Sequence, residues 1–184
     1  MNKLIEREEM ILNKDKLKRA IIFLFYDKDG IVDDYIPTLF QGLKGFYDKL
    51  CFVANGKLSE EGKEKLKDYV TDFLVRENKG FDVWGYKAGL EFFGWEELEK
   101  YDEVILMNYT IFGPLYPFSE MFESMNKKDL DFWGITKHHE VDFDVFNTCK
   151  YGYIPEHIQS SFLVIRNSLL KTKDYKDLWE NMPM

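Results

Sequence analysis

Three short polar clusters carry the side chains of this 184-residue chain that could take part in chemistry. The first, "RENKGFD", holds Arg76, Asn78, Gly80 and Asp82, which are a cation, an amide, a glycine and a carboxylate. A guanidinium can grip a phosphate through two hydrogen bonds, glycine lets the backbone approach a ligand, and a helix N-terminus favours an anion. The cluster predicts an anion-binding loop, with the open alternative that Asp82 only caps the next helix.

The other two clusters flank apolar runs. Asn108, Tyr109 and Thr110 follow "VILM", whereas "HIQS" places His157 and Gln159 before "FLVI". Alternation along a strand would put His157 and Gln159 on one face, although a histidine beside a strand is often a structural hydrogen-bonding group, and that alternative stays open. The chain has no HExxH, GxGxxG, Walker or GxSxG pattern, so zinc-protease, dinucleotide, P-loop and serine-hydrolase sites are set aside.

Apolar runs predict the strands that would position these clusters. We expect strands at 20–26, 49–56, 71–78, 102–110, 129–136 and 160–167, and helical stretches at 34–47, 59–70, 82–93, 119–125 and 168–179. This alternation predicts an α/β fold with a mostly parallel central sheet flanked by helices. Residues 137–156 show no clear periodicity and are expected to form a long loop.

In a sheet of this kind, ligands bind in the crevice outside the carboxyl ends of the strands. The residues of interest are therefore those that follow each strand. They are Asp27, Asn55, residues 76–82 and residues 108–110.

Composition narrows the class of protein further. The net charge of -8 argues against a general nucleic-acid binder, and no apolar run approaches the roughly 20 residues that span a bilayer. Cys51 and Cys149 show no CxxC spacing, and the charged N-terminus lacks a secretory signal, so we expect a reduced, cytoplasmic protein. We expect a single domain over 1–184, with 1–18 as a helical or loose lead-in. The aromatic content of 17% fits either an aromatic core or a stacking site.

Taken in order, "RENKGFDVWGYKAGL", "ILMNYTIFGPL", "DFWGIT" and "HIQSSFLVI" resemble the rhamnan synthesis protein F family of bacterial glycosyltransferases, over roughly residues 20–179. The resemblance implies a GT-A-like nucleotide-sugar-binding fold. It also implies transfer of a sugar such as L-rhamnose from a nucleotide-sugar donor to a glycan or lipid-linked glycan acceptor, in the assembly of cell-wall or capsular polysaccharide. Peripheral association with the inner face of the membrane would suit a lipid-linked acceptor.

The resemblance and the strand-end positions together give the expected site residues. We expect Asp131 and His157 to be catalytic, Asp131 as a base and His157 as a base or a phosphate contact. The expected donor-binding residues are Asp27, Arg76, Asn78, Gly80, Asp82, Asn108, Tyr109, Thr110 and Gln159.

Tyr109 is the main departure from the family pattern, which commonly has Asn-Asp-Ser where this chain has Asn-Tyr-Thr. The missing carboxylate lies where many GT-A enzymes hold Mg²⁺ or Mn²⁺, and a neutral phenol is a poor ligand for a hard cation. We therefore assign no metal ligand. The alternative function is a non-catalytic GT-A-like interaction or glycan-binding domain that has lost the metal site. The chain also ends at "LWENMPM", where members usually continue, so we expect a shortened domain.

Overall fold

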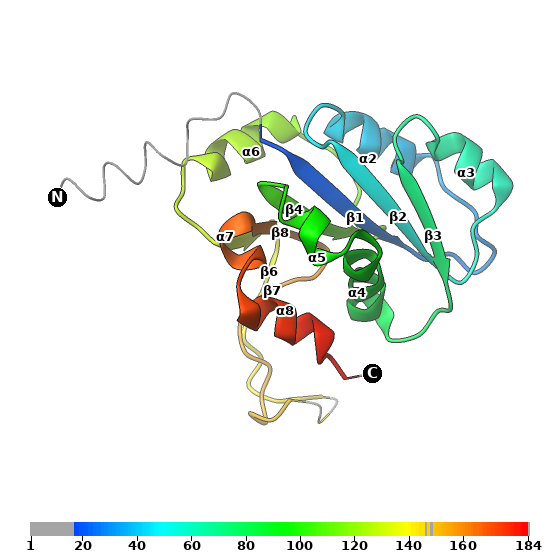
Figure 1. Cartoon of the computed structure of the whole chain (residues 1–184). Helices are drawn as coiled ribbons and strands as arrows, with labels where there is room; N and C mark the ends of the chain where they lie inside the picture. Colours follow the sequence, from blue (N-terminus) through cyan, green and yellow to red (C-terminus); the bar gives the residue numbers. More distant parts are fainter. Residues whose placement is uncertain (1–16, 146, 148, 184) are drawn as a thin grey trace.

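The computed structural model describes residues 17–145, 147 and 149–183 of the chain. Its centre is a six-stranded sheet in the order β3-β2-β1-β4-β8-β5, with helices on both faces (Figure 1). The predicted α/β class, with a mostly parallel central sheet flanked by helices, is confirmed. The lead-in predicted at residues 1–18 lies almost wholly outside the described residues, and the single-domain assignment stays a prediction.

The strands of the sheet are β1 (Arg19–Phe25), β2 (Lys49–Asn55), β3 (Asp72–Arg76), β4 (Glu103–Asn108), β5 (Phe132–Gly134) and β8 (Phe162–Arg166). The four strands β1 to β4 pair in parallel, and β8 runs antiparallel to both β4 and β5. β1 and β4 are buried along their whole length, as expected for continuous apolar runs inside a parallel sheet. We call the side where β1 to β4 end the carboxyl edge, and the opposite side the amino edge.

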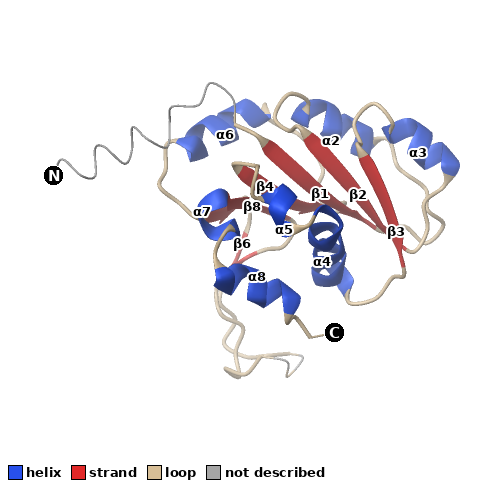
Figure 2. Cartoon of the chain, viewed as in Figure 1, coloured by secondary structure: helices blue, strands red, loops and turns tan. Residues whose placement is uncertain are grey.

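The helices divide between the two faces of the sheet (Figure 2). They are α2 (Tyr35–Leu43), α3 (Glu60–Leu66), α4 (Phe81–Phe93), α5 (Trp95–Leu98), α6 (Phe118–Asn126), α7 (Asn167–Leu170) and α8 (Lys173–Glu180). The helices α2, α3 and α6 contribute to the hydrophobic cluster on one face, and α4, α5, α7 and α8 to the cluster on the other. Ser59 caps α3, because its hydroxyl accepts the Gly62 N–H at 3.0 Å.

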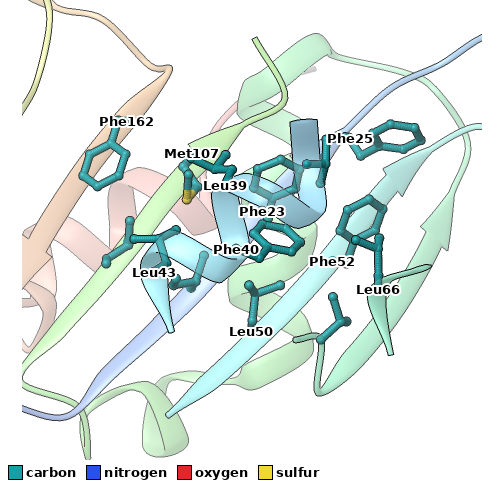
Figure 3. Packing of buried hydrophobic residues seen from close by; sticks show 14 of the residues in the cluster. Phe23, Phe25, Leu39, Phe40, Leu43, Leu50, Phe52, Leu66, Met107 and Phe162 are labelled. Carbon is teal, nitrogen blue, oxygen red and sulfur yellow. The ribbon is translucent and has the colours of Figure 1, made fainter. Parts of the chain in front are cut away.

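Phenylalanines fill much of the core beneath α2 (Figure 3). The Phe23 ring meets Phe40 edge-on at a centroid distance of 4.8 Å and stacks on Phe52 at 5.4 Å. Such pairs add to the stabilisation from burial alone. Much of the aromatic content therefore serves packing, which answers the question that composition left open for these residues.

Helix α4 lies very close to β1 because two glycines face the strand. A Cβ atom at Gly85 would lie 2.3 Å from Leu24, and one at Gly89 would lie 2.3 Å from Ile22. The close approach fixes α4 on the sheet, and it thereby fixes the N-terminus of α4 at the carboxyl edge.

A two-stranded antiparallel ribbon, β6 (Lys137–His138) with β7 (His157–Ile158), bounds the segment that was predicted to be a long loop. A further bridge joins Val141 to Ile154, so this excursion is partly a hairpin. In the described part of the chain, no helix is both long and apolar enough to cross a membrane.

Candidate functional site

The ends of β2 and β3 hold Arg76 in place at the carboxyl edge. Asn55 and Arg76 are register partners, and the Arg76 Nη1 donates to Asn55 Oδ1 at 2.5 Å. Its Nη2 donates to the Lys79 carbonyl at 3.0 Å, and burial lowers the pKa of the guanidinium from its ordinary value. A guanidinium carries five N–H donors. Arg76 can therefore shape its own loop and still offer donors to an anion.

The loop after Arg76 turns sharply into α4. Gly80 has a φ of 72°, and a Cβ there would lie 2.3 Å from the Trp84 ring, so glycine is required for both reasons. Gly80 itself is the N-cap residue of α4. The alternative prediction that Asp82 caps the helix is wrong, because Asp82 lies inside the first turn and its side chain bonds elsewhere. Asn78 lies exposed on this loop.

Asp82 joins the first cluster to the other two. Its Oδ2 accepts a hydrogen bond from Asn108 Nδ2 at 2.8 Å and one from Ser160 Oγ at 3.3 Å. The Asn108 side chain is buried, and its Oδ1 accepts from the Thr110 N–H at 3.1 Å and the Thr110 hydroxyl at 2.6 Å. Three segments that are distant in sequence therefore share one hydrogen-bonded network at the carboxyl edge.

Tyr109 lies on the α2 side of the same edge. Its ring is 6.1 Å from Phe25 and 6.5 Å from Tyr26, measured between centroids. Burial raises the pKa of the Tyr109 phenol, and the negative charges of Asp82 and Asp27 add to the rise. The phenol is therefore neutral near pH 7.

The Asp27 carboxylate is engaged by the backbone of its own loop. Its Oδ1 accepts the Ile31 N–H at 2.8 Å and the Asp29 N–H at 2.9 Å. The bond from Ile31 is the main reason that the pKa of Asp27 lies below its ordinary value. Asp27 shapes the turn that follows β1 and reaches the carboxyl edge as predicted.

The third cluster reaches the carboxyl edge through the ribbon and the loop before β8. The His157 ring stacks on His138 at a centroid distance of 5.0 Å, and its Nδ1 is 2.8 Å from the Pro155 carbonyl. The Gln159 N–H donates to the Thr136 carbonyl at 3.0 Å. Both side chains are exposed, whereas Ser160 makes the direct link to Asp82.

Asp131 does not join this site. It precedes β5 and accepts a hydrogen bond from the Ser168 hydroxyl at 2.6 Å, while its carbonyl accepts the Arg166 N–H at 2.9 Å. Arg166 pairs with Glu103, the first residue of β4, whereas Asn108 is the last. At about 3.3 Å per residue, these positions lie roughly 17 Å apart, so the expected catalytic residue Asp131 stands at the amino edge.

Two residues outside the expected set complete the network. Tyr86 is buried, and its hydroxyl donates to the Ser160 carbonyl at 2.7 Å. Burial is the main cause that raises the pKa of this phenol. Its spacing from Asp82 could have identified Tyr86 in the sequence, because a residue four positions further on lies on the same face of α4. Ser160 was visible in "HIQS" but was not among the expected donor-binding residues.

The side chains at the carboxyl edge are poorly suited to act as ligands of a divalent cation. Asp27 already accepts two backbone N–H groups, Asp82 accepts two side-chain hydrogen bonds, and Tyr109, whose pKa both carboxylates raise, is a neutral phenol. Within the described residues, no group of three or more His, Cys, Asp or Glu side chains is arranged to hold a metal ion.

An apolar hollow of about 470 Å³ lies beside this edge. It is lined mainly by residues 111–118 and by parts of α2 and α6, with Glu120 as its carboxylate. Phe112, Leu115 and Tyr116 are 72%, 92% and 75% exposed. The segment that follows β4 therefore presents large apolar side chains to solvent.

The fold and the edge network define an α/β protein whose polar residues converge at the carboxyl ends of parallel strands. The family model described as rhamnan synthesis protein F matches residues 50–184, and the chain belongs to that family. The match begins at β2 and includes all three clusters.

Two curated relatives match most of the chain. Virulence protein VirA of Vibrio anguillarum is 26% identical over 177 residues, covering 86% of this chain and 56% of that protein. Protein y4gN of Sinorhizobium fredii is 20% identical over 166 residues, covering 89% of this chain and 40% of that protein. The chain thus spans about half the length of the curated relatives it matches.

Solved structures are more distant. A protein of Desulfovibrio desulfuricans, taken to be a nucleotide-diphospho-sugar transferase, shares 16% identity at a TM-score of 0.47, covering 91% of this chain and 75% of its own. Core-mannan synthase A of Aspergillus fumigatus shares 9% identity at a TM-score of 0.42, covering 92% and 65%. Likenesses at this level define neither a ligand nor a reaction.

Proposed function

We propose that this chain is the donor-binding domain of a glycosyltransferase that uses a nucleotide-sugar. The observation that carries the proposal is the network through Asp82, which brings three separate polar clusters to the carboxyl edge of a mostly parallel sheet. Ligands of such sheets bind at this edge. Membership of the rhamnan synthesis protein F family supports the reaction class.

In this proposal the loop from Arg76 to Asp82 meets the diphosphate of the donor. Arg76 supplies positive charge, and the N-terminus of α4 adds the partial positive charge of its backbone N–H groups. Asn108, Tyr109 and Thr110 lie near the sugar, with the buried Asn108 held in position by Asp82. Transfer with inversion needs a base for the acceptor hydroxyl and stabilisation of charge on the leaving diphosphate.

His157 is the proposed contact for the acceptor or the diphosphate. Its ring is exposed on the ribbon at the carboxyl edge, and Nδ1 faces a backbone carbonyl. That contact orients the ring with Nε2 as the nitrogen that remains to bond a ligand. Gln159 follows on the same segment and is a proposed donor contact.

We propose that donor binding does not depend on a divalent cation. The two carboxylates nearest Tyr109 are already hydrogen-bonded, and the phenol is neutral, so charge on the diphosphate would be met by Arg76 and by backbone N–H groups. Adding Mn²⁺ or EDTA should therefore leave donor affinity unchanged, whereas EDTA would weaken binding at a metal-dependent site.

The finer assignments follow the family. We propose L-rhamnose as the transferred sugar and a glycan or lipid-linked glycan as the acceptor, in polysaccharide assembly at the inner face of the membrane. The exposed apolar side chains of residues 111–118 would suit an acceptor that carries a lipid.

The test is calorimetric titration with a panel of uridine, guanosine, thymidine and cytidine diphosphate sugars. We expect binding by the wild type and a loss of about 10- to 150-fold on Arg76→Ala, because hydrogen bonds to charged groups are worth about 1.5–3 kcal/mol. Lys171→Ala removes an exposed cation next to α7 and should leave affinity unchanged. No binding of any donor at millimolar concentration would refute the proposal.

Tyr109 favours one second candidate, a domain that keeps the fold but does not catalyse transfer. Under this candidate the protein assists another transferase or binds glycan, and the phenol replaces a lost metal ligand. Donor turnover separates the two functions. If wild type turns over donor without metal, the enzyme is active; if only Tyr109→Asp does so, and only with Mn²⁺, the wild-type domain is non-catalytic.

A further inference from the structure

Phe81, at the carboxyl edge, combines a highly exposed side chain with an unusual backbone conformation. It is 88% exposed, more than any other phenylalanine among the described residues. Its φ is 51°, and it directly follows Gly80 at a φ of 72°, so two successive residues are left-handed. The left-handed region is unfavourable for an L residue with a bulky side chain, and an exposed ring forgoes its burial.

The residues on either side hold this conformation. On one side, Arg76 bonds the Lys79 carbonyl, and Gly80 packs against the Trp84 ring. On the other, Asp82 is fixed by its bonds to Asn108 and Ser160. The loop that carries the exposed Phe81 ring is therefore restrained at both ends. This restraint limits the conformational entropy that the loop backbone would lose on binding a ligand.

The place of Phe81 in the chain bears on the kind of group that its ring could contact. The same short segment carries the groups proposed to meet the diphosphate, and in a nucleotide the phosphates are joined to the planar base through a single ribose. An aromatic side chain next to a phosphate-binding loop is therefore well placed for the base. Tyr26, 40% exposed at the end of β1, adds a second aromatic group at this edge.

We propose that Phe81 stacks on the base of the donor nucleotide. This inference rests on the proposed function and adds the part of the donor that the loop selects, namely a planar aromatic base. Stacking of a base on an aromatic side chain tolerates every base, because each has a π face. Phe81 accordingly contributes affinity for nucleotides over plain diphosphate, without choosing among bases.

The experiment compares uridine and guanosine diphosphate with inorganic pyrophosphate by calorimetry. Stacking on aromatic residues contributes about 5- to 150-fold per base. Phe81→Ala should weaken both nucleotides within this range and leave pyrophosphate affinity unchanged, whereas Phe81→Trp should retain nucleotide binding. Phe92→Ala, which removes a half-exposed ring from the far end of α4, is the matched control and should change nothing.

The melting temperature distinguishes a structural role of Phe81 from a role in nucleotide binding. Phe81→Gly relieves the left-handed backbone, so it should melt at the same or a higher temperature than wild type while losing nucleotide affinity as Phe81→Ala does. Equal nucleotide affinity of wild type and Phe81→Ala would overturn the inference and leave the proposed function standing. Failure of wild type to bind either nucleotide or any donor sugar would overturn both. A dimer that dissociates on Phe81→Ala, with unchanged nucleotide affinity, would show that the ring contacts a second copy instead.

Discussion

The hydrogen bond between Asp82 and Asn108 should couple the stability of α4 to that of β4. Asn108 is 2% exposed, and its Nδ2 donates to Asp82 Oδ2 at 2.8 Å across 26 positions of sequence. Replacing Asp82 with alanine leaves a buried donor without this partner. The same substitution removes the bond from Ser160 at 3.3 Å.

The size of the effect follows from the burial of the pair. A hydrogen bond to a charged group contributes about 1.5–3 kcal/mol, and a buried donor left unpaired costs about 1–3 kcal/mol. Asp82 is only partly buried, so water can replace part of its role, and we expect a loss of about 2 kcal/mol for Asp82→Ala. For a chain of this size, that loss lowers Tm by about 4–8 °C.

The assay is urea unfolding of wild type, Asp82→Ala, Asn108→Ala and the double variant, followed by tryptophan fluorescence. The cycle should give a coupling energy of about 1.5 kcal/mol or more, because each single variant removes the same bond. Glu123→Ala, at an exposed acid on α6, is the control for loss of a surface carboxylate. Coupling below about 0.5 kcal/mol would refute the view that this bond joins the two elements.

Three further predictions concern packing, charge and reactivity. Gly89→Ala should destabilise the fold by about 1–3 kcal/mol in urea unfolding, because its Cβ would lie 2.3 Å from Ile22; an unchanged midpoint would show that α4 shifts freely. Glu103→Gln should cost about 3–5 kcal/mol by the same assay, since the 2%-exposed Glu103 side chain bonds two mostly buried arginines at 2.6 and 3.2 Å; a loss under about 1 kcal/mol would contradict that role. Burial raises the pKa of the Cys51 thiol to about 12, so at pH 8 a thiol reagent should label Cys149 quickly and Cys51 only after unfolding; rapid labelling of both in native protein would contradict the buried position.

The sheet could be predicted because its strands are continuous apolar runs bounded by turns. The runs that became β1 and β4 are buried on both faces, and a short unbroken apolar run between turn residues is typical of such a strand. The short ribbon of β6 and β7 could not be predicted in this way, because two-residue strands carry no period. Their pairing depends on contacts between segments about 20 residues apart.

The placement of the candidate residues at the carboxyl edge was predicted in part, for a related reason. Strand ends located Asp27, Arg76 and Asn108, because parallel strands bring their carboxyl ends to one edge. The role of Asp82 depended on a partner 26 positions away, so the local sequence left open a cap that the structure does not form. Asp131 was expected from a motif rather than from strand direction. Because it precedes a strand that points the same way as β4, it lies at the amino edge.

The most direct test of the proposed donor site is a crystal structure of this chain with a bound nucleotide-diphosphate sugar. We expect the diphosphate beside Arg76 and Gly80, the sugar next to Asn108 and Thr110, and the base against Phe81. A donor bound at the amino edge near Asp131, or away from the loop between β3 and α4, would contradict it.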